Sequence, residues 1–417
     1  MKTIVFRKFA FWALTAITFT LITGCNDPVS DYTPDPPPPP PPDPFELLYW
    51  STLSMSKDWY DSNPQASEFI ISNAGELAYL AKLVNTGKNF SGKIITLVND
   101  IDLGGKEWVP IGYTGYVNGY DYDYSFNGIF DGNDKAIRGL YFRYINTADD
   151  GFYSAGLFGY VDSGTVKNLG IVDANVIGTG SGGGSIGIVA GQVGVGSVFN
   201  CYSSGTINGE GNVGGVVGVI GGGRIINCYS NSTVSSSRSF VGGVVGSMYN
   251  GSVTNCYATG TVEGRSYVGG VAGMIFDGSV VSNCYSAGTF NGNSIVGGIV
   301  GSVMEPSTAV GLGYAPGRNC TVSNCAALQL YSWSLLHDGR IIANTYNNAT
   351  LSSNVAFSGM GGLGGGANTV DGADITAAEI RADGTIGGRF TAANGWTVEN
   401  GKLPGIGAAV DMPEHLR

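Results

Sequence analysis

An internal repeat of about 28 residues in the middle of the chain restricts its possible folds more than any other sequence feature. Four Asn-Cys-Tyr triplets recur at steps of 27, 28 and 28 residues, beginning at Asn200, Asn227, Asn255 and Asn283. Val-Gly-Gly segments advance by 28, 27 and 28 residues, beginning at Val213, Val241, Val268 and Val296. Two independent markers with one period indicate repeated structural units.

Each unit has the pattern of β-strands. Cys256, Ala258, Gly260 and Val262 alternate with the residues between them, and this period of two is typical of strands. A unit of about three short strands cannot bury its apolar face alone, so successive units must stack. The sequence therefore predicts an all-β, right-handed parallel β-helix, a β-solenoid in which each unit is one coil about 4.8 Å above the last.

Stacking would place every marker residue over its counterpart, forming ladders. The asparagines are expected at turns, where their side chains bond to the backbone of the next coil. The cysteines are expected to face inward as buried thiols, because a straight column of thiols fits neither a tetrahedral zinc site nor disulfide geometry. No metal or cofactor is expected. These ladders comprise Asn200, Asn227, Asn255, Asn283, Cys201, Cys228, Cys256 and Cys284.

The tyrosines of the triplets have the opposite parity and are expected to stack outward. Such a column could bind a sugar ring or an extended polymer, or its rings could simply cover the sheet and stabilise one another. We take the column as the predicted ligand-binding surface, comprising Tyr202, Tyr229, Tyr257 and Tyr285. Cys320 and Cys325 lie outside the strict period and are the better candidates for a disulfide.

Groups suited to catalysis are sparse. The only carboxylates between Thr179 and Val303 are Glu210, Glu263 and Asp277, and the only histidines of the chain are His337 and His415. A glycoside hydrolase or lyase would need paired carboxylates, and acidic residues are dense only upstream, at Asp100, Asp102, Asp121, Asp123, Asp131 and Asp134. The segment 131–134 could bind calcium or form a surface turn. We predict no catalytic residue and no enzyme activity.

The N-terminus has the features of an export signal. Lys2, Arg7 and Lys8 precede an apolar stretch, and Ile22-Thr23-Gly24-Cys25 follows. This resembles a bacterial lipoprotein signal, which implies cleavage before Cys25 and lipidation of that residue; an ordinary secretory signal is the alternative. Seven prolines from Pro36 to Pro42 predict a stiff polyproline II spacer. With a formal net charge of −11, nucleic acid and anionic lipid are poor partners.

The flanks of the repeats are expected to form caps. Asn73 and Glu76 predict the start of a short amphipathic helix that closes one end of the solenoid. Gly395-Trp396 and Leu403-Pro404 are expected to close the other end. We therefore divide the chain into a signal peptide (1–24), a lipidated linker (25–44), an N-terminal cap (45–93), the β-helix (94–360) and a C-terminal cap (361–417).

Several segments resemble, in order, the GLUG-motif surface proteins of Bacteroidetes. They are "IITLVNDIDLGGKEWVPIG", "FNGIFDGNDKAIRGLYF", "AGLFGYVDSGTVKNLGIV" and the Asn-Cys-Tyr and Val-Gly-Gly repeats. The resemblance implies a solenoid involved in adhesion, and many members carry a provisional description as adhesins. The motif also occurs beside metallopeptidase domains, but the chain has no His-Glu-x-x-His sequence, so no catalytic residue carries over. The missing Tyr after Cys325 and the irregular spacing from Met304 to Asn319 depart from the pattern.

Together these features predict a lipid-anchored protein of the outer membrane or cell surface that binds a glycan or a host or matrix protein through its solenoid face. The alternatives are a carbohydrate-active β-helix enzyme that uses the upstream carboxylates, and a structural spacer.

Overall fold

The computed structural model describes residues 55–117, 120–145, 153–179, 183–304, 318–330, 338–345, 349–360 and 365–417. The chain divides into two compact units, Met1–Pro44 and Phe45–Arg417. Cys25, the proline run and His337 lie outside the described residues. In the described ranges, no helix combines the length and apolar character that crossing a bilayer requires.

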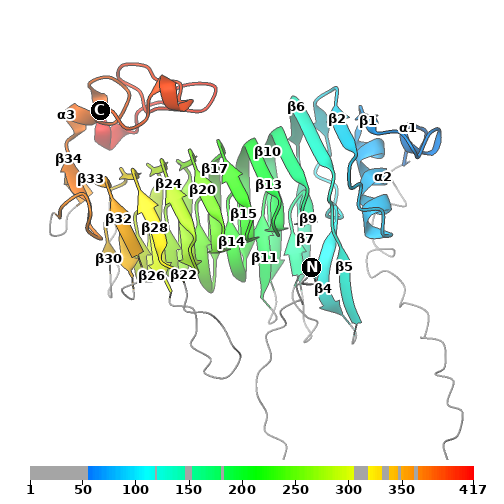
Figure 1. Cartoon of the computed structure of the whole chain (residues 1–417), viewed down its shortest axis with the longest axis horizontal. Coiled ribbons are helices and arrows are strands. Elements are labelled where there is room, and N and C mark those ends of the chain that lie inside the picture. The colour runs from blue at the N-terminus through cyan, green and yellow to red at the C-terminus, as the bar shows by residue number, and fades with distance from the viewer. Residues whose placement is uncertain are drawn as a thin grey trace, which may run out of the picture. The chain divides into compact units, whose positions relative to one another are not determined.

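The unit from Phe45 is an all-β parallel solenoid of about nine coils with a repeat of about 28 residues, which confirms the predicted fold class (Figure 1). The Val-Gly-Gly markers lie in register, since Val213 pairs with Val241, Val241 with Val268, and Val268 with Val296. The right-handed winding stays a prediction.

Most coil strands belong to one large sheet that follows the chain around each coil. These strands are β1 (Glu68–Ile71), β2 (Ile94–Leu97), β3 (Ile101–Asp102), β6 (Ile129–Arg138), β7 (Tyr141–Ile145), β8 (Tyr153–Ala155), β10 (Thr165–Thr179), β11 (Gly184–Gly187), β13 (Ser197–Gly209), β14 (Gly211–Gly214), β16 (Arg224–Ile226), β17 (Tyr229–Ser236), β18 (Ser239–Gly242), β20 (Ser252–Thr254), β21 (Tyr257–Ala258), β22 (Thr261–Gly269), β24 (Val280–Ser282), β25 (Tyr285–Ser286), β26 (Thr289–Gly297), β28 (Cys320–Ser323), β29 (Ala326–Ala327), β30 (Asp338–Gly339), β32 (Ala349–Ser352), β33 (Val355–Phe357) and β34 (Ala373–Ile375).

A second parallel sheet forms the opposite wall, in the order β31-β27-β23-β19-β15-β12-β9. Its strands are β9 (Phe158–Val161), β12 (Ala190–Val193), β15 (Val217–Gly221), β19 (Val245–Tyr249), β23 (Ala272–Phe276), β27 (Val300–Val303) and β31 (Ile342–Asn344). The strands β4 (Tyr113–Val117) and β5 (Tyr120–Tyr124) pair separately as an antiparallel hairpin. Between the walls lies a core of mainly Val and Ile.

The walls approach so closely that some inward positions admit only glycine. A Cβ built on Gly246 would lie 2.5 Å from the Val213 amide nitrogen and 2.7 Å from the Gly218 carbonyl oxygen. Real Cβ atoms essentially never come this close to backbone atoms, so the glycine that follows Val244-Val245 is required by packing.

A helix covers the first coil, as expected. Helix α2 (Ala74–Asn85) begins after Asn73, whose side chain accepts a hydrogen bond from the Glu76 amide at 3.1 Å. Glu76 in turn accepts from the Ser72 amide at 2.6 Å, one residue earlier than a standard capping box places it. The short helix α1 (Asp58–Asp61) precedes it.

The C-terminal segment differs from the simple end cap that we predicted. Strand β34 extends the stack by pairing with β33, and helix α3 (Ala377–Arg381) follows. The chain then folds back along the side of the solenoid, where the Tyr285 hydroxyl donates to the Pro404 carbonyl at 2.6 Å. The buried Arg340 forms an ion pair with Asp374 of β34 at 2.6 Å, which attaches the start of the C-terminal segment to the solenoid. We call residues 382–417 the return segment.

Candidate functional site

The four predicted tyrosines form one continuous stack. Neighbouring ring centroids lie 5.2, 4.7 and 4.9 Å apart, with interplanar angles of 7°, 3° and 2°. Gly170 and Ala326 occupy the equivalent positions in the coils on either side. Because each ring packs its faces against the neighbouring rings, only the edges of the rings are left to contact a ligand.

The return segment covers half of this column. Tyr285 is fully buried and Tyr257 is 3% exposed, whereas Tyr202 and Tyr229 are partly exposed. The Trp396 ring lies 5.8 Å from the Tyr285 ring and 6.1 Å from that of Tyr257. Tyr257 and Tyr285 face outward as expected but are not exposed, because a segment distant in sequence packs on them. In this structure the column is chiefly scaffold.

The asparagines form a side-chain ladder. The Nδ2 groups of Asn200, Asn227 and Asn255 each donate to the Oδ1 of the preceding rung at 3.1 to 3.2 Å. All four repeat asparagines have a positive φ of 51° to 53°, which Asn tolerates well. The predicted bonds to the backbone of the next coil are thus bonds between amide side chains. Asp131 ends the ladder, since its Oδ1 accepts from Asn168 at 3.0 Å.

The cysteines form a buried column of free thiols. The amide of Cys201 donates to the Cys228 sulfur at 3.3 Å, and that of Cys228 to the Cys256 sulfur at 3.4 Å. Burial raises the pKa of the Cys201 and Cys256 thiols, so they stay protonated at neutral pH. Cys284 lies in the same column.

The suggested disulfide is absent from the structure. Cys320 and Cys325 are both free and buried. Cys325 continues the thiol column, because Tyr285 and Ala326, the residues after Cys284 and Cys325, are in register. Cys320 pairs instead with Ala349, so it lies in another column, five residues before Cys325 along the chain.

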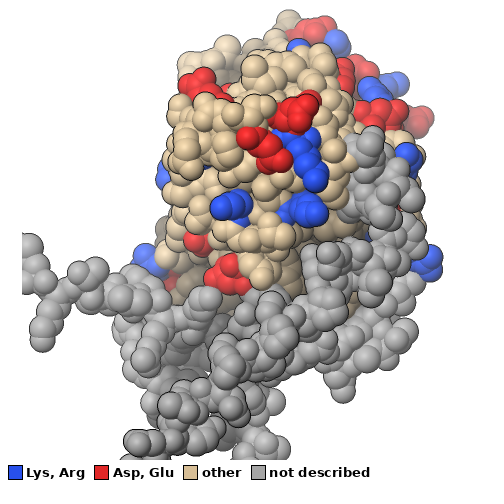
Figure 2. Space-filling model, turned by 90° about the vertical axis from the view of Figure 1, so that its right-hand side faces the viewer, with Lys and Arg blue, Asp and Glu red and all other residues tan. Residues whose placement is uncertain are grey.

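The upstream aspartates accept hydrogen bonds from backbone amides, and one of them pairs with a lysine. Asp100 accepts from the Ala136 amide at 2.8 Å, and Asp102 accepts from the Gly104 amide at 2.7 Å. Asp131 forms an ion pair with Lys167 at 2.8 Å. The side chain of Asp121 lies outside the described side chains. At this end of the solenoid, acidic and basic side chains are intermixed (Figure 2).

The segment 131–134 lies within β6, and Asn133 and Asp134 have φ values of 49° and 57°. It therefore has the geometry of a surface bend. Within the described ranges, no group of three or more His, Cys, Asp or Glu side chains is arranged to hold a metal ion. The ring of His415 lies 2.7 Å from the Leu328 carbonyl oxygen, where it fixes the return segment.

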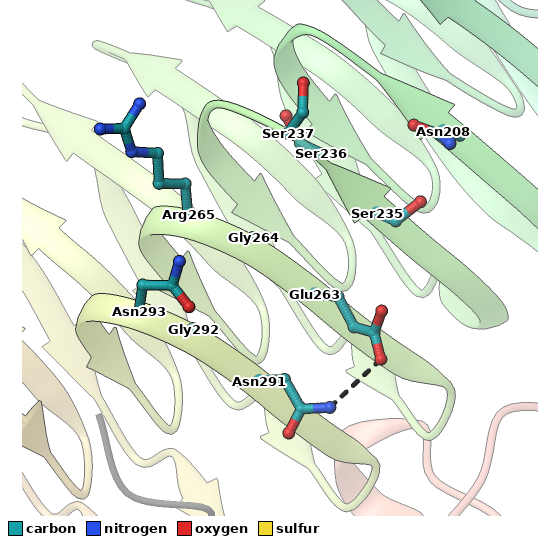
Figure 3. Close-up of a pocket in the computed structure, with 10 residues that line it drawn as sticks. All are labelled: Asn208, Ser235, Ser236, Ser237, Glu263, Gly264, Arg265, Asn291, Gly292 and Asn293. Atoms are coloured by element: carbon teal, nitrogen blue, oxygen red, sulfur yellow. Dashed lines mark hydrogen bonds between the residues drawn. The ribbon is translucent and has the colours of Figure 1, made fainter. Parts of the chain in front are cut away.

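The sequence reasoning missed a polar groove of about 730 Å³ on the solenoid wall (Figure 3). One column of its lining runs through four successive coils in register, from Asn208 through Ser235 and Glu263 to Asn291. Asn291 donates to Glu263 at 3.1 Å, and Arg265 extends from the adjoining bend of β22. Period-two alternation places these residues outward, but their identities vary between coils, so they gave no repeat signal.

Comparisons with known proteins agree with the repeat. Residues 240–263 match the family model described as "The GLUG motif", which confirms the resemblance for that segment. No curated protein matches the chain. One solved structure that it resembles is that of a "putative immunoglobulin A1 protease" from Bacteroides ovatus, at 21% identity and a TM-score of 0.49. The match covers 79% of this chain and 89% of that one.

Proposed function

We propose that the protein is exported, lipid-anchored at the cell surface and binds an extracellular glycan or matrix protein through the solenoid wall. The column from Asn208 to Asn291 carries the binding part of this proposal. It presents a hydrogen-bonding side chain at each coil, about 4.8 Å apart, beside a groove of about 730 Å³. Evenly spaced polar groups suit a ligand that is itself a repeating polymer.

Binding is tested with the soluble fragment Phe45–Arg417 on an array of polysaccharides, mucin-type glycans and matrix proteins. In the test variant, Ser235, Glu263 and Asn291 are changed to Ala. We expect specific binding that weakens by about tenfold or more in this variant, because several hydrogen bonds are lost together. A matched control changes Arg224 and Ser252, in the coils of Ser235 and Glu263, and Thr321, one coil beyond Asn291. With Val280 they form an in-register column on another strand.

Three outcomes distinguish binding at the groove, binding elsewhere on the solenoid and a purely structural role. Loss of binding in the test variant alone supports the groove as the site. Equal binding by both variants would move the site elsewhere on the solenoid. Absence of binding to every ligand class on the array would contradict the proposal and leave the structural spacer as the better reading, which the covered tyrosine column also favours.

The anchor is tested independently. The sequence Ile22-Thr23-Gly24-Cys25 and the proline spacer that follows support lipidation. Expressed in a bacterium that processes lipoproteins, the full chain should incorporate labelled palmitate and sediment with membranes, and Cys25→Ser should do neither. Unchanged sedimentation of Cys25→Ser would contradict the anchor without bearing on the groove.

A further inference from the structure

Backbone positions of positive φ follow a clear rule in this chain. Among the described residues, seventeen non-glycine residues have positive φ, and Asn or Asp occupies eleven of them. These residue types tolerate the left-handed region because their short side chains bond locally. The ladder positions Asn200, Asn227, Asn255 and Asn283 are examples. Where the scaffold alone needs this conformation, the sequence supplies a residue that suits it.

Three successive coils break the rule at one corner. Phe240, Tyr267 and Ile295 have φ values of 68°, 56° and 56°, and bulky or β-branched residues are strained in this region. They occupy equivalent positions, because the flanking Val241, Val268 and Val296 are in register. We call the three residues the corner column.

Core packing accounts for other bulky residues with positive φ but not for the corner column. Phe90 is 6% exposed and Ile386 is fully buried, so their side chains contribute to the core. The corner residues are all partly exposed. Asparagine or glycine at these positions would remove the backbone strain and leave the hydrophobic core intact, since none of the three side chains belongs to the core cluster or packs against it. The bulky side chains therefore have a use that outweighs the strain.

Their location indicates that use. Arg265 and Asn293, which line the groove, each lie two residues before a corner residue in the same strand, β22 or β26. The rings of Phe240 and Tyr267 stack with their centroids 5.2 Å apart and an interplanar angle of 26°. In the preceding coil the equivalent residue is Asn212, so the stack begins at Phe240 on that side. An apolar platform thus adjoins a groove of amide, hydroxyl, carboxylate and guanidinium groups.

We infer that the corner column is the sugar-stacking platform of a glycan-binding site whose polar half is the groove. This inference rests on the proposed function and narrows its ligand to a glycan. One sugar ring of the glycan packs its C–H face on the side of the Phe240 ring that Tyr267 does not cover, while neighbouring sugar units bond through their hydroxyls to Glu263, Arg265 and Asn293. The regular spacing of the polar groups along the coils favours a glycan over a protein, because a glycan presents hydroxyls and C–H faces that themselves repeat.

The decisive variants are Phe240→Asn and Tyr267→Asn, singly and together, in the fragment Phe45–Arg417. Because Asn suits positive φ, we expect each variant to unfold at the same or a higher denaturant concentration than the parent. Each should also lose about tenfold or more in affinity for the oligosaccharides that the parent retains on the array. A gain or equality in stability combined with lost binding is the signature of residues kept for a ligand.

The matched control is Phe276→Asn. Phe276 is also partly exposed and packs on another ring, that of Tyr249 at 5.0 Å, but it is not among the residues with positive φ. This variant relieves no strain, so its stability should fall while glycan binding stays unchanged.

Two results would overturn the inference. If Phe240→Asn and Tyr267→Asn unfold at clearly lower denaturant, the side chains are structural. If array binding persists in both variants, or the parent binds only proteins, the ligand does not use this platform, although the protein remains a binding protein. Complete absence of binding by the parent is a different result, because it contradicts the proposed function itself.

Discussion

At the scale of single residues, glycine shows how packing restricts this sequence. Gly246 and Gly221 both lie in the second sheet, yet they differ in what a methyl group would meet. At Gly246 it would contact backbone atoms at 2.5 to 2.7 Å, whereas at Gly221 the nearest atom is the Val193 carbonyl oxygen at 3.9 Å. Both substitutions add the same methyl group, so a difference between their effects on stability reports how well that group fits.

We predict that Gly246→Ala lowers the free energy of unfolding by about 1–3 kcal/mol, because the backbone must move to accept the methyl group. Gly221→Ala should change it by less than about 0.5 kcal/mol. Urea unfolding of the two variants provides the comparison. Equal effects would show that the walls are not in contact at Gly246.

Individual residues also show which features of the structure could be predicted from the sequence. The inward parity of the cysteines and the turn at each asparagine followed from a period of two and one break in parity. The hydrogen bonds between side chains along the Asn ladder could not be predicted in this way, because they depend on the rotamer of each amide. The strained corner was not visible either, since Phe, Tyr and Ile at a turn give no signal until φ is known.

At the scale of elements, Asp131 ties the end of the Asn ladder to the neighbouring strand. Partial burial alone would raise the pKa of its carboxyl group, but hydrogen bonds from Lys167, Asn168 and the Asn133 amide outweigh burial and lower that pKa. A carboxyl group with a lowered pKa stabilises the folded state above its unfolded pKa. This contribution disappears as the pH falls through the folded pKa.

We therefore expect Asp131→Asn to be less stable than the parent at about pH 7 and to lie closer to it at about pH 3, because the stabilisation from Asp131 declines below its unfolded pKa and is lost as the pH falls through the lowered folded pKa. Urea midpoints at both pH values give the measurement. The control is Asp173→Asn, since the Asp173–Arg138 pair at 3.2 Å is 73% and 58% exposed and contributes little. A stability difference for Asp131→Asn that is the same at both pH values would contradict this account.

The return segment is the element that sequence reasoning placed least well. Its contact between Tyr285 and Pro404 joins residues 119 positions apart, and no periodicity signals such a contact. The composition of 361–417 identified a region outside the repeats, but an end cap and a segment folded along the side have the same local pattern. Only packing of Trp396 and Phe390 against the tyrosines decides between them.

Removing the Trp396 ring should release this segment. We predict that Trp396→Ala weakens its attachment by about 3–5 kcal/mol, since a buried ring is replaced by a cavity. Native-state trypsin should then cleave at Arg389 or Lys402 and leave the solenoid intact. Val195→Ala, at a side chain that is 63% exposed, is the control and should resist like the parent. Equal resistance of both variants would show that other contacts hold the segment.

At the scale of the whole molecule, each coil pairs with the coils before and after it, and the return segment adds distant contacts only at some of them. Coil-to-coil pairing repeats in register along the solenoid, as at Val213, Val241 and Val268. Stability in such an architecture approximates a sum of coil and interface contributions. Its length is therefore adjustable in units of one coil, and this is why the period alone was sufficient to predict the fold.

Deleting residues 213–240 removes one period and joins Asn212 to Val241, whose partners lie in register. We predict that this variant folds, with strand content like that of the parent in circular dichroism and a cooperative thermal transition. Deleting residues 213–226 removes half a period, places inward residues outward and should yield aggregated protein. Folding of both deletions, or of neither, would contradict the coil as the unit of stability.

The stacked tyrosines also give the protein an optical property. Excitation energy migrates readily between aromatic rings at separations of 4.7 to 5.2 Å, and Trp396, at 5.8 Å from Tyr285, receives it at one end of the stack. While the return segment is docked, light absorbed by the four phenols is emitted by indole. When the segment leaves, emission from tyrosine returns, so the ultraviolet spectrum of the unlabelled chain reports the state of its own C-terminus.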